Sequence, residues 1–231
     1  MTLLWDLSAA FDTLDHSIFL GKLHSYGFNE ESRKWFCSYL KDRQQYVDVS
    51  GTTSSVKKTP RGSPQGAICS PLIFTIYISD MPLWTRDSSI MSYADDTSTT
   101  ISRPEIEDAL QRTEEDAQRM MAFMNTNYLV ANASKTKLII FRPRHNNTDK
   151  RESVKIGSAM VMETESERLL GLVVSNNMGW ADHIRNLKAA LNQRVGLLRR
   201  LSYSIPQECL TQVAQGLVLS KIRYGLSIFG T

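Results

Sequence analysis

An adjacent pair of aspartates lies between two short runs with strand character, residues 90–93 and 97–101, in this 231-residue chain. The pattern predicts a β-hairpin with Asp95 and Asp96 at its turn, where at least one carboxylate projects outward. Like charges this close repel each other unless a cation lies between them. Mg2+ takes hard oxygen ligands and is usually held by one or two carboxylates together with substrate phosphates. The pair suggests a metal site for phosphoryl chemistry, although most such pairs are solvated turns, so a further carboxylate is needed.

The composition is that of an ordinary globular protein. With 42% apolar and 22% charged residues, the chain can form one large domain or two modest ones. Its apolar runs fall short of the ~20 residues that a membrane helix needs. A signal peptide is not expected, because the N-terminus lacks a basic region and reaches Asp6 at once. Three separated cysteines without a C-x-x-C pattern favour a reducing compartment. We therefore expect an intracellular protein of the nucleus or cytoplasm, not secreted and without a membrane partner.

Charge is segregated along the chain although the net charge is only +3. Residues 135–151 hold six basic residues and one acid, and residues 185–200 hold five basic residues and no acid, namely Arg185, Lys188, Arg194, Arg199 and Arg200. Such stripes can neutralise phosphates, so nucleic-acid binding is one interpretation and a solvated helix face is the other. The acidic residues from Glu105 to Asp116 are interpreted as a solvent-facing side of a helix.

Hydrophobic periodicity and turn residues predict strands interspersed with helices, followed by a helical tail. Strands are expected at 3–5, 44–49, 136–141 and 169–174, the last broken at Gly171. Helices are expected at 15–27 and 30–40, from an N-cap at Ser70 to about 81, after Pro104, beyond Trp180, and from Pro206 to about 224. The methionines at 120, 121 and 124 are interpreted as core residues, and Asp12, Asp15 and His16 as capping and packing groups at the start of a helix.

Three separated segments carry a resemblance to a known family. Residues 3–12 (LLWDLSAAFD) place Asp6 at the end of a buried strand, residues 61–66 (RGSPQG) form a loop before a buried helix, and residues 93–96 (YADD) form the hairpin turn. In this order they resemble motifs A, B and C of reverse transcriptases, most closely those of non-LTR (LINE-type) retrotransposons. Further segments resemble the family's motif D, primer grip and thumb, at 129–137, 168–172 and 224–229. The resemblance covers almost the whole chain.

The resemblance implies an RNA-directed DNA polymerase that adds deoxynucleotides to a primer 3'-hydroxyl. Two Mg2+ ions, or Mn2+ in their place, would lie roughly 3.5 to 4 Å apart and stabilise the attacking and leaving oxygens together. Asp6 and Asp95 are the expected metal ligands, joined by the backbone carbonyl of Leu7. Asp96 is expected to be a weaker catalytic participant.

Nucleotide-binding residues follow from the same resemblance. Phe11 occupies the position of the family's steric gate under the sugar, and a core aromatic is its alternative interpretation. Gln65 and Gly66 are expected to contact the incoming nucleotide or templating base, because Gly66 permits close backbone approach and Gln65 both donates and accepts. Lys135 matches a proposed proton donor to pyrophosphate, with Lys137 or a plain surface lysine as the alternative.

The implied fold is α+β. A polymerase palm over residues 1–178 would contain a mostly antiparallel sheet with helices on one face and an RRM-like core, and residues 179–231 would form an α-helical partial thumb. Leu170 and Gly171 are expected to form the primer grip. The implied partners are an RNA template, a DNA primer and deoxynucleoside triphosphates. The chain begins five residues before Asp6, so the fingers and endonuclease segments of a parent polyprotein are expected to be missing, and the oligomeric state stays open.

Two alternatives belong to other functional classes. One is a catalytically silent retroelement remnant that binds nucleic acid through the stripes at 135–151 and 185–200. The other is a palm-fold nucleotidyl cyclase, which shares paired metal carboxylates but has no role for the loop at 61–66 or for thumb-like helices.

Overall fold

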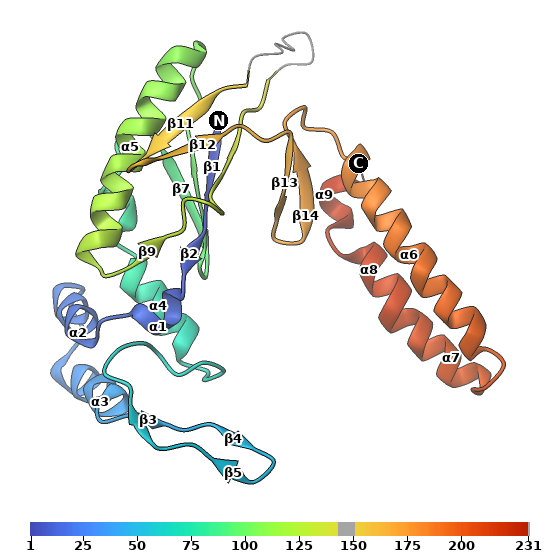
Figure 1. Ribbon diagram of the computed structural model, residues 1–231, viewed down its shortest axis with the longest axis horizontal. Coiled ribbons are helices and arrows are strands. Elements are labelled where there is room, and N and C mark those ends of the chain that lie inside the picture. The colour runs from blue at the N-terminus through green and yellow to red at the C-terminus, as the bar shows by residue number, and fades with distance from the viewer. Residues whose placement is uncertain (143–150, 231) are drawn as a thin grey trace. The chain divides into compact units, whose positions relative to one another are not determined.

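The computed structural model of the chain describes residues 1–142 and 151–230. The chain divides into two compact units, the first comprising residues 1–138 and 150–163 and the second residues 139–149 and 164–231. Within the first unit, Figure 1 shows strands with helices beside them, and within the second it shows a hairpin and a set of helices. The boundary placed at residue 178 concerns functional subdomains and stays a prediction.

A four-stranded sheet with the order β10-β1-β8-β7 organises the first unit. Its strands are β1 (Thr2–Trp5), β7 (Ser89–Tyr93), β8 (Asp96–Thr100) and β10 (Lys137–Ile139). β8 is antiparallel to both β1 and β7, with Trp5 opposite Thr97 and Tyr93 opposite Asp96. The predicted strand at 3–5 and the predicted hairpin around Asp95 and Asp96 are therefore confirmed.

The segment after β1 is a run of short elements with defined caps. These are β2 (Leu7–Ser8), α1 (Ala10–Thr13), α2 (His16–Ser25) and α3 (Glu30–Leu40). The Asp15 carboxylate accepts the N–H groups of Ser17 and Ile18 at 2.9 and 3.1 Å, and the Asn29 side chain accepts that of Ser32 at 2.8 Å. Such caps satisfy the free N–H groups of a first turn. The two predicted helices are confirmed.

An exposed hairpin follows α3. It comprises β3 (Gln44–Gln45), β4 (Asp48–Val49), β5 (Thr52–Thr53) and β6 (Lys57–Lys58), with β3 paired to β6 and β4 to β5. Ser50 and Gly51 both have positive φ at the tip, which is the geometry of a tight two-residue hairpin turn. The strand predicted at 44–49 is thus present as two short pieces of one arm.

The buried helix predicted near residue 71 is α4 (Ser70–Ile78), followed by the 3-10 turn η1 (Met81–Leu83). Pro71 lies in its first turn, where its missing N–H costs nothing. The expectation that Ser70 is the N-cap is wrong by one residue. Cys69 takes that position, because the Ser70 hydroxyl instead donates to the carbonyl of Pro64 in the preceding loop.

The long amphipathic helix predicted after Pro104 is α5 (Ile106–Thr126), which Figure 1 shows lying along the sheet. The interpretation of its acidic side as purely solvent-facing is wrong at Asp116, which is only 1% exposed. Its carboxylate accepts the backbone N–H groups of Arg86, Asp87 and Ser88 at 2.7 to 3.0 Å. Helical periodicity alone contains no sign of this loop.

The core of the first unit lies where α2, α4 and α5 meet. Its fully buried side chains include Phe19, Phe74, Tyr77, Met120 and Met124. The interpretation of the methionines as core residues is therefore confirmed for Met120 and Met124, whereas Met121 is only half-buried. The Tyr77 hydroxyl donates to the Asn127 carbonyl at 2.7 Å, and burial raises the pKa of Tyr77 to about 12.

Three further strands complete the first unit: β9 (Val130–Ala131), β11 (Ser153–Ile156) and β12 (Ala159–Met162). β9 pairs with β2, and β11 pairs with β12. The hairpin of β11 and β12 is not among the predicted elements. It contacts α5, where the N–H of Lys155 donates to Glu114 at 2.8 Å.

In the second unit, the segment predicted as one strand over 169–174 is a hairpin, which corrects that prediction. Its strands are β13 (Ser166–Leu169) and β14 (Leu172–Ser175), and Leu170 and Gly171 form the turn with φ of 45° and 85°. A chain with two successive positive φ values reverses direction, so no single strand can pass through it.

The predicted helical tail is confirmed. It consists of α6 (Ala181–Leu201), α7 (Gln207–Ala214), the π-helical turn η2 (Gln215–Leu219), α8 (Ser220–Arg223) and α9 (Leu226–Phe229). Pro206 precedes α7 as predicted. No helix in the described part of the chain is long and apolar enough to cross a membrane, and the three cysteines are all free.

Candidate active site

The hairpin turn fixes the first part of the site. Tyr93 pairs with Asp96, which leaves Ala94 and Asp95 as the two-residue connection between β7 and β8. Ala94 has a φ of 53°, in the left-handed region where a residue with a Cβ is strained by about 1 kcal/mol. This strained turn places Asp95 at the tip and Asp96 at the first position of β8.

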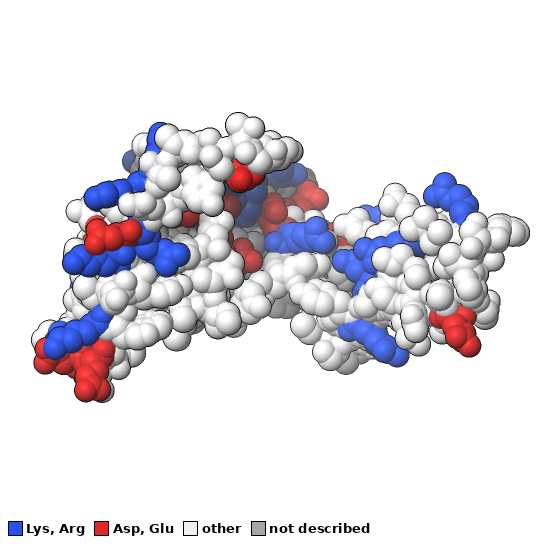
Figure 2. Space-filling view, turned by 90° about the horizontal axis from the view of Figure 1, so that it is seen from below, with Lys and Arg blue, Asp and Glu red and all other residues white. Residues whose placement is uncertain are grey.

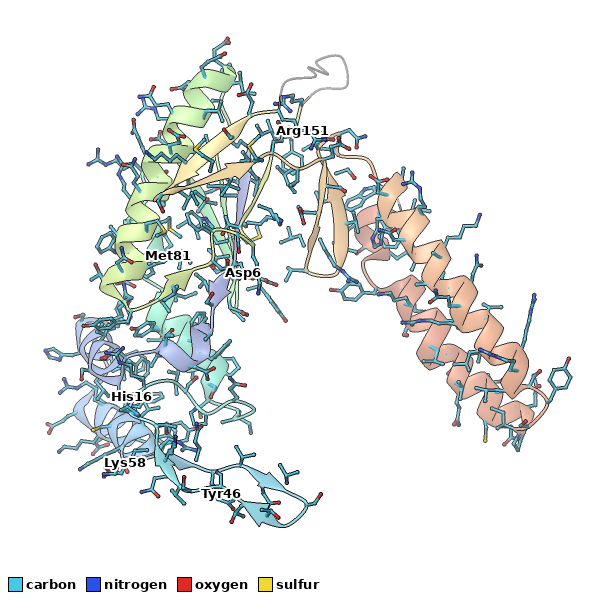
Figure 3. All side chains as sticks on the ribbon, in the orientation of Figure 1. Asp6, His16, Tyr46, Lys58, Met81 and Arg151 are labelled. Carbon is cyan, nitrogen blue, oxygen red and sulfur yellow. The ribbon has the colours of Figure 1, made fainter. Side chains whose placement is uncertain are left out.

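The strand register brings Asp6 to the same place. Trp5, the last residue of β1, lies opposite Thr97, so Asp6 follows β1 at the end of the sheet where β8 begins with Asp96. The chain is held there because the carbonyl of Asp6 accepts the N–H of Asn132 at 2.8 Å. Figure 3 labels Asp6 where β1 leads into β2. Two segments about ninety residues apart thus converge on one end of the sheet.

The three carboxylates influence one another electrostatically. Partial burial, followed by the negative charges of Asp95 and Asp6, raises the pKa of Asp96 above its usual range. Mutual repulsion of this kind is relieved by a bound cation or by protonation. Among the residues that the structure describes, no set of three or more His, Cys, Asp or Glu side chains forms a preformed metal cage. A metal site at these three aspartates therefore stays a prediction.

Lys135 adds a positive charge to this corner. Its Nζ lies 3.9 Å from the Asp6 carboxylate, and both side chains are partly exposed. An exposed pair at that distance contributes little to stability. Lys135 follows β9 in a turn, where the N–H of Lys135 donates to the Asn132 carbonyl. The structure thus brings Lys135 to Asp6.

A pocket of about 580 Å3 opens next to the aspartates. It is lined by Leu7, Phe11, Gln65, Gly66 and Asp95, together with Ala9, Ala10, Asp12, Ala67, Ser70 and Pro71. The volume falls within the usual range for small-molecule sites. All predicted nucleotide-binding residues except Lys135 are therefore gathered around one cavity that also contains a predicted metal ligand.

The Phe11 ring lies against Phe74, with centroids 4.8 Å apart, while it lines the pocket. Phe11 therefore packs on α4 and forms part of the pocket wall, and its role as a steric gate stays a prediction.

One interaction in the pocket is missed by sequence reasoning. The side-chain amide of Gln65 donates from Nε2 to both carboxylate oxygens of Asp12, at 2.9 and 3.0 Å. A carboxylate only accepts, so this interaction fixes which way the amide points and leaves its oxygen free to face elsewhere. The interpretation of Asp12 as a capping residue is corrected accordingly, because its carboxylate holds Gln65.

The loop that carries Gln65 is fitted closely to the segment after β1. The N–H of Gly62 donates to the Leu14 carbonyl at 2.7 Å, and that of Ser63 donates to the Phe11 carbonyl at 2.8 Å. A Cβ added at Gly62 would lie 2.9 Å from the Asp12 backbone, at a φ of 84° that disfavours side chains. Gly66 also has positive φ, but with open space around it.

The remaining predicted residues lie in the second unit. Leu170 and Gly171 form the β13–β14 turn, where the Tyr224 hydroxyl donates to the Leu170 carbonyl at 2.5 Å. A Cβ added at Gly171 would lie 3.1 Å from the Tyr224 ring. The thumb-like segment at 224–229 thus contacts the predicted primer grip within one unit.

The five basic residues of α6 differ in their surroundings. Arg185 pairs with Asp182 at 2.7 Å, and Arg194 donates to the Leu217 carbonyl at 2.5 Å, so both have structural roles. Lys188, Arg199 and Arg200 are exposed. Of the other basic segment, 135–151, residues 143–150 lie outside the described residues.

Comparison with known sequences gives the class of the protein. The sequence model of the family described as Reverse transcriptase (RNA-dependent DNA polymerase) matches residues 1–174, which include Asp6, Asp95, Asp96 and every residue that lines the pocket. The chain belongs to this family. That membership leaves the nucleotidyl cyclase alternative without support.

Individual relatives come from non-LTR mobile elements. The chain is 25% identical over 238 residues to the RNA-directed DNA polymerase from mobile element jockey of Drosophila melanogaster, a match that covers 97% of this chain and 25% of that protein. It is also 25% identical over 237 residues to the Pol polyprotein from the type-1 retrotransposable element R1 of Bradysia coprophila, covering 97% and 22%. The chain thus spans about a quarter of the length of these relatives.

Solved structures agree on the fold. A telomerase from Candida tropicalis, in complex with a TWJ fragment of telomeric RNA, matches with a TM-score of 0.53 and 13% identity, covering 98% of this chain and 39% of that one. The telomerase from Candida albicans, in complex with the corresponding fragment, matches with a TM-score of 0.50 and 14% identity, covering 98% and 40%. The mixed helix-and-sheet fold is therefore similar to that of a reverse transcriptase.

Proposed function

We propose that this chain is the RNA-directed DNA polymerase domain of a non-LTR retroelement polyprotein, which adds deoxynucleotides to a primer 3'-hydroxyl on an RNA template. The observation that carries the proposal is the convergence of Asp6, Asp95 and Asp96 beside a pocket lined by Phe11 and Gln65. Membership in the reverse transcriptase family and the mobile-element relatives support it. This membership and these relatives do not favour the alternative of a catalytically silent remnant.

Divalent metal dependence accompanies this function. Asp6, Asp95 and the backbone carbonyl of Leu7 would hold the ions, and hard carboxylate oxygens fit Mg2+ or Mn2+. When bound, two such ions lower the pKa of the primer hydroxyl and stabilise charge on the triphosphate. Asp96, at the first position of β8, adds negative charge beside this pair and has a weaker catalytic role.

The pocket residues would bind the nucleotide. The Phe11 ring, held against Phe74, forms the wall under the sugar and excludes a 2'-hydroxyl. Asp12 fixes the Gln65 amide, so Gln65 meets the substrate with a defined donor and acceptor pattern. Gly66 allows the backbone to approach the base closely. Lys135, near Asp6, is placed to donate a proton to the departing pyrophosphate.

The subdomain assignment belongs to the same proposal. Residues 1–178 form the palm, with the β1-β8-β7 sheet in its RRM-like core, and residues 179–231 form a partial thumb. The Leu170–Gly171 turn acts as the primer grip. The exposed basic side chains of α6, Lys188, Arg199 and Arg200, contact the primer-template backbone, and Arg185 and Arg194 assist them once released from their internal partners.

A primer-extension assay with Mg2+, deoxynucleotides and an RNA template tests the proposal. Asp95→Asn keeps size and shape and removes one charge, so it should reduce incorporation at least about a hundredfold, as expected when a charge that stabilises the transition state is removed. Asp108→Asn is the matched control, because Asp108 makes only surface ion pairs. Equal incorporation by the parent chain and Asp95→Asn would refute the proposal.

A further inference from the structure

Two aromatic side chains one turn apart on α3 form an ordered, exposed platform. Trp35 is 52% exposed, and its ring lies parallel to that of Tyr39, with centroids 5.3 Å apart and 6° between the planes. Beneath it, the buried Phe36 contacts Trp35 edge to face at 4.9 Å. The tryptophan is thus held in one orientation while half of its surface remains in water. Large aromatic groups held in this way are typical of binding sites.

Basic side chains extend the platform onto the neighbouring hairpin. The Arg43 guanidinium lies 5.3 Å from the centre of the Tyr39 ring, in cation–π geometry. The carbonyl of Arg43 accepts the N–H of Thr59, and Gln45 lies opposite Lys57. Since side chains alternate along a strand, Arg43 and Lys57 share one face of the hairpin and Lys58 lies on the other.

The charge of this region is strongly one-sided. Residues 33–61 contain seven basic and two acidic side chains. Lys34 and Arg61 have ion-pair partners, Glu30 and Asp15. Arg43, Lys57 and Lys58 are exposed and make no ion pair with any residue that the structure describes. Figure 2 shows Lys and Arg side chains gathered over the side of the molecule where α3 and this hairpin lie, with fewer acidic groups among them.

We propose that the surface formed by Trp35, Tyr39, Arg43 and Lys57 binds single-stranded nucleic acid. Unpaired bases offer flat faces that stack on exposed aromatic rings, and the phosphates that follow them meet Lys and Arg. A duplex keeps its bases stacked internally and offers the aromatic pair nothing to stack on. None of these four residues lines the pocket at the aspartates. The proposal therefore does not rest on the polymerase activity proposed above.

Binding of a single-stranded RNA of about 12 nucleotides to the full chain, in chelator and without nucleotides, tests this surface. Trp35→Ala should weaken binding about five- to hundredfold, the effect expected for one stacked base. Trp35→Phe keeps a ring and should restore most of the affinity. The double change Arg43→Ala and Lys57→Ala should lower the slope of log affinity against log salt by about 0.7 for each phosphate that the protein no longer neutralises.

Lys34→Ala is the charge control, since it removes one positive charge from α3, next to Trp35, and from a side chain already paired with Glu30. It should change affinity by no more than about twofold, as expected for an exposed ion-paired lysine. Asp95→Asn, which removes incorporation under the proposed function, should bind this RNA as the parent does. Thermal melting of each variant confirms that it folds.

Three results would each overturn the proposal. One is unchanged affinity in Trp35→Ala. Another is a loss of affinity in Lys34→Ala that equals the loss in the double variant Arg43→Ala and Lys57→Ala. That result would mean that binding is a non-specific attraction between charges. The third is a loss of affinity for duplex RNA, heparin or an acidic peptide in Trp35→Ala as large as the loss for the single strand, which would mean that the surface binds a polyanion or a protein instead.

Discussion

Asp116 gives the strongest stability prediction, because a single buried carboxylate holds a whole loop. Its side chain is 2% exposed and accepts the N–H groups of Arg86, Asp87 and Ser88, while Arg119 donates to it at 2.6 Å. Burial alone would raise the pKa of Asp116, but the hydrogen bonds from Arg86, Ser88, Arg119 and Asp87 outweigh burial and lower the pKa to about 2. The folded chain therefore stabilises the charged form.

The magnitude follows from linkage between protonation and folding. The ordinary pKa of 3.8 and the folded value of about 2 differ by about 1.8, and at 1.36 kcal/mol for each unit this is about 2.4 kcal/mol. The folded value is the lower one, so the folded chain binds fewer protons. The stabilisation is complete above about pH 4 and disappears as the pH falls towards 2. Asp116→Asn should therefore lower the free energy of unfolding by about 2 kcal/mol at neutral pH.

Urea denaturation near pH 7 and again near pH 3 measures this effect. The difference in free energy of unfolding between the parent chain and Asp116→Asn should be smaller at the lower pH, because protonation of Asp116 then removes the charge that stabilises the parent. Asp108→Asn on the same helix is the control and should change stability by less than about 0.5 kcal/mol. If the two free energies of unfolding are equal at neutral pH, or differ by the same amount at both pH values, the charge of Asp116 does not hold the loop.

Two further predictions concern the pocket. Gly62→Ala should destabilise the fold by about 2 kcal/mol or more, because its Cβ would lie 2.9 Å from the Asp12 backbone at a φ of 84°. Gly21→Ala is the control, because open space surrounds Gly21 in α2, and it should be neutral or stabilising by up to about 1 kcal/mol. Equal melting temperatures of the two variants would contradict this prediction. Asp12→Ala should free the Gln65 amide and raise the KM for the deoxynucleotide about five- to tenfold, because a hydrogen bond to a charged group is removed. The melting temperature should change little. An unchanged KM would exclude a role of Asp12 in positioning Gln65.

Local signals predict the parts of this fold that depend on neighbouring residues. Asp15 and Asn29 cap the helices that the sequence predicts, and the alternation around Asp95 indicates the hairpin. The β11–β12 hairpin also has a local signal, with Val154 and Ile156 buried on alternate positions before a turn. It escapes prediction because the run is short, and short runs are ambiguous between strand and loop.

Interactions between distant residues lie beyond such signals. Nothing near Asp116 in sequence shows that three backbone N–H groups from residues 86–88 will surround it, and an acid on an amphipathic helix normally faces water. The bond from Gln65 to Asp12 likewise joins residues 53 positions apart. Hydrophobic periodicity does not indicate that Asp6 and Asp95 lie close together. Only the family resemblance, which rests on the order of three motifs, predicts this.

Asp116 and the candidate active site are physically connected. Residues 86–88, held by Asp116, lead directly into β7 at Ser89, and β7 runs without interruption to the turn that carries Asp95. β8, the other strand of the hairpin, is paired with β1, so Asp6 and Asp96 lie at the same end of the sheet. Carboxylates that repel one another stay together only if the backbone holds them, and metal chemistry tolerates errors of about 0.5 Å. The buried acid of α5 therefore contributes to the position of the exposed acids of the sheet, and loosening the 86–88 loop should impair catalysis as well as stability.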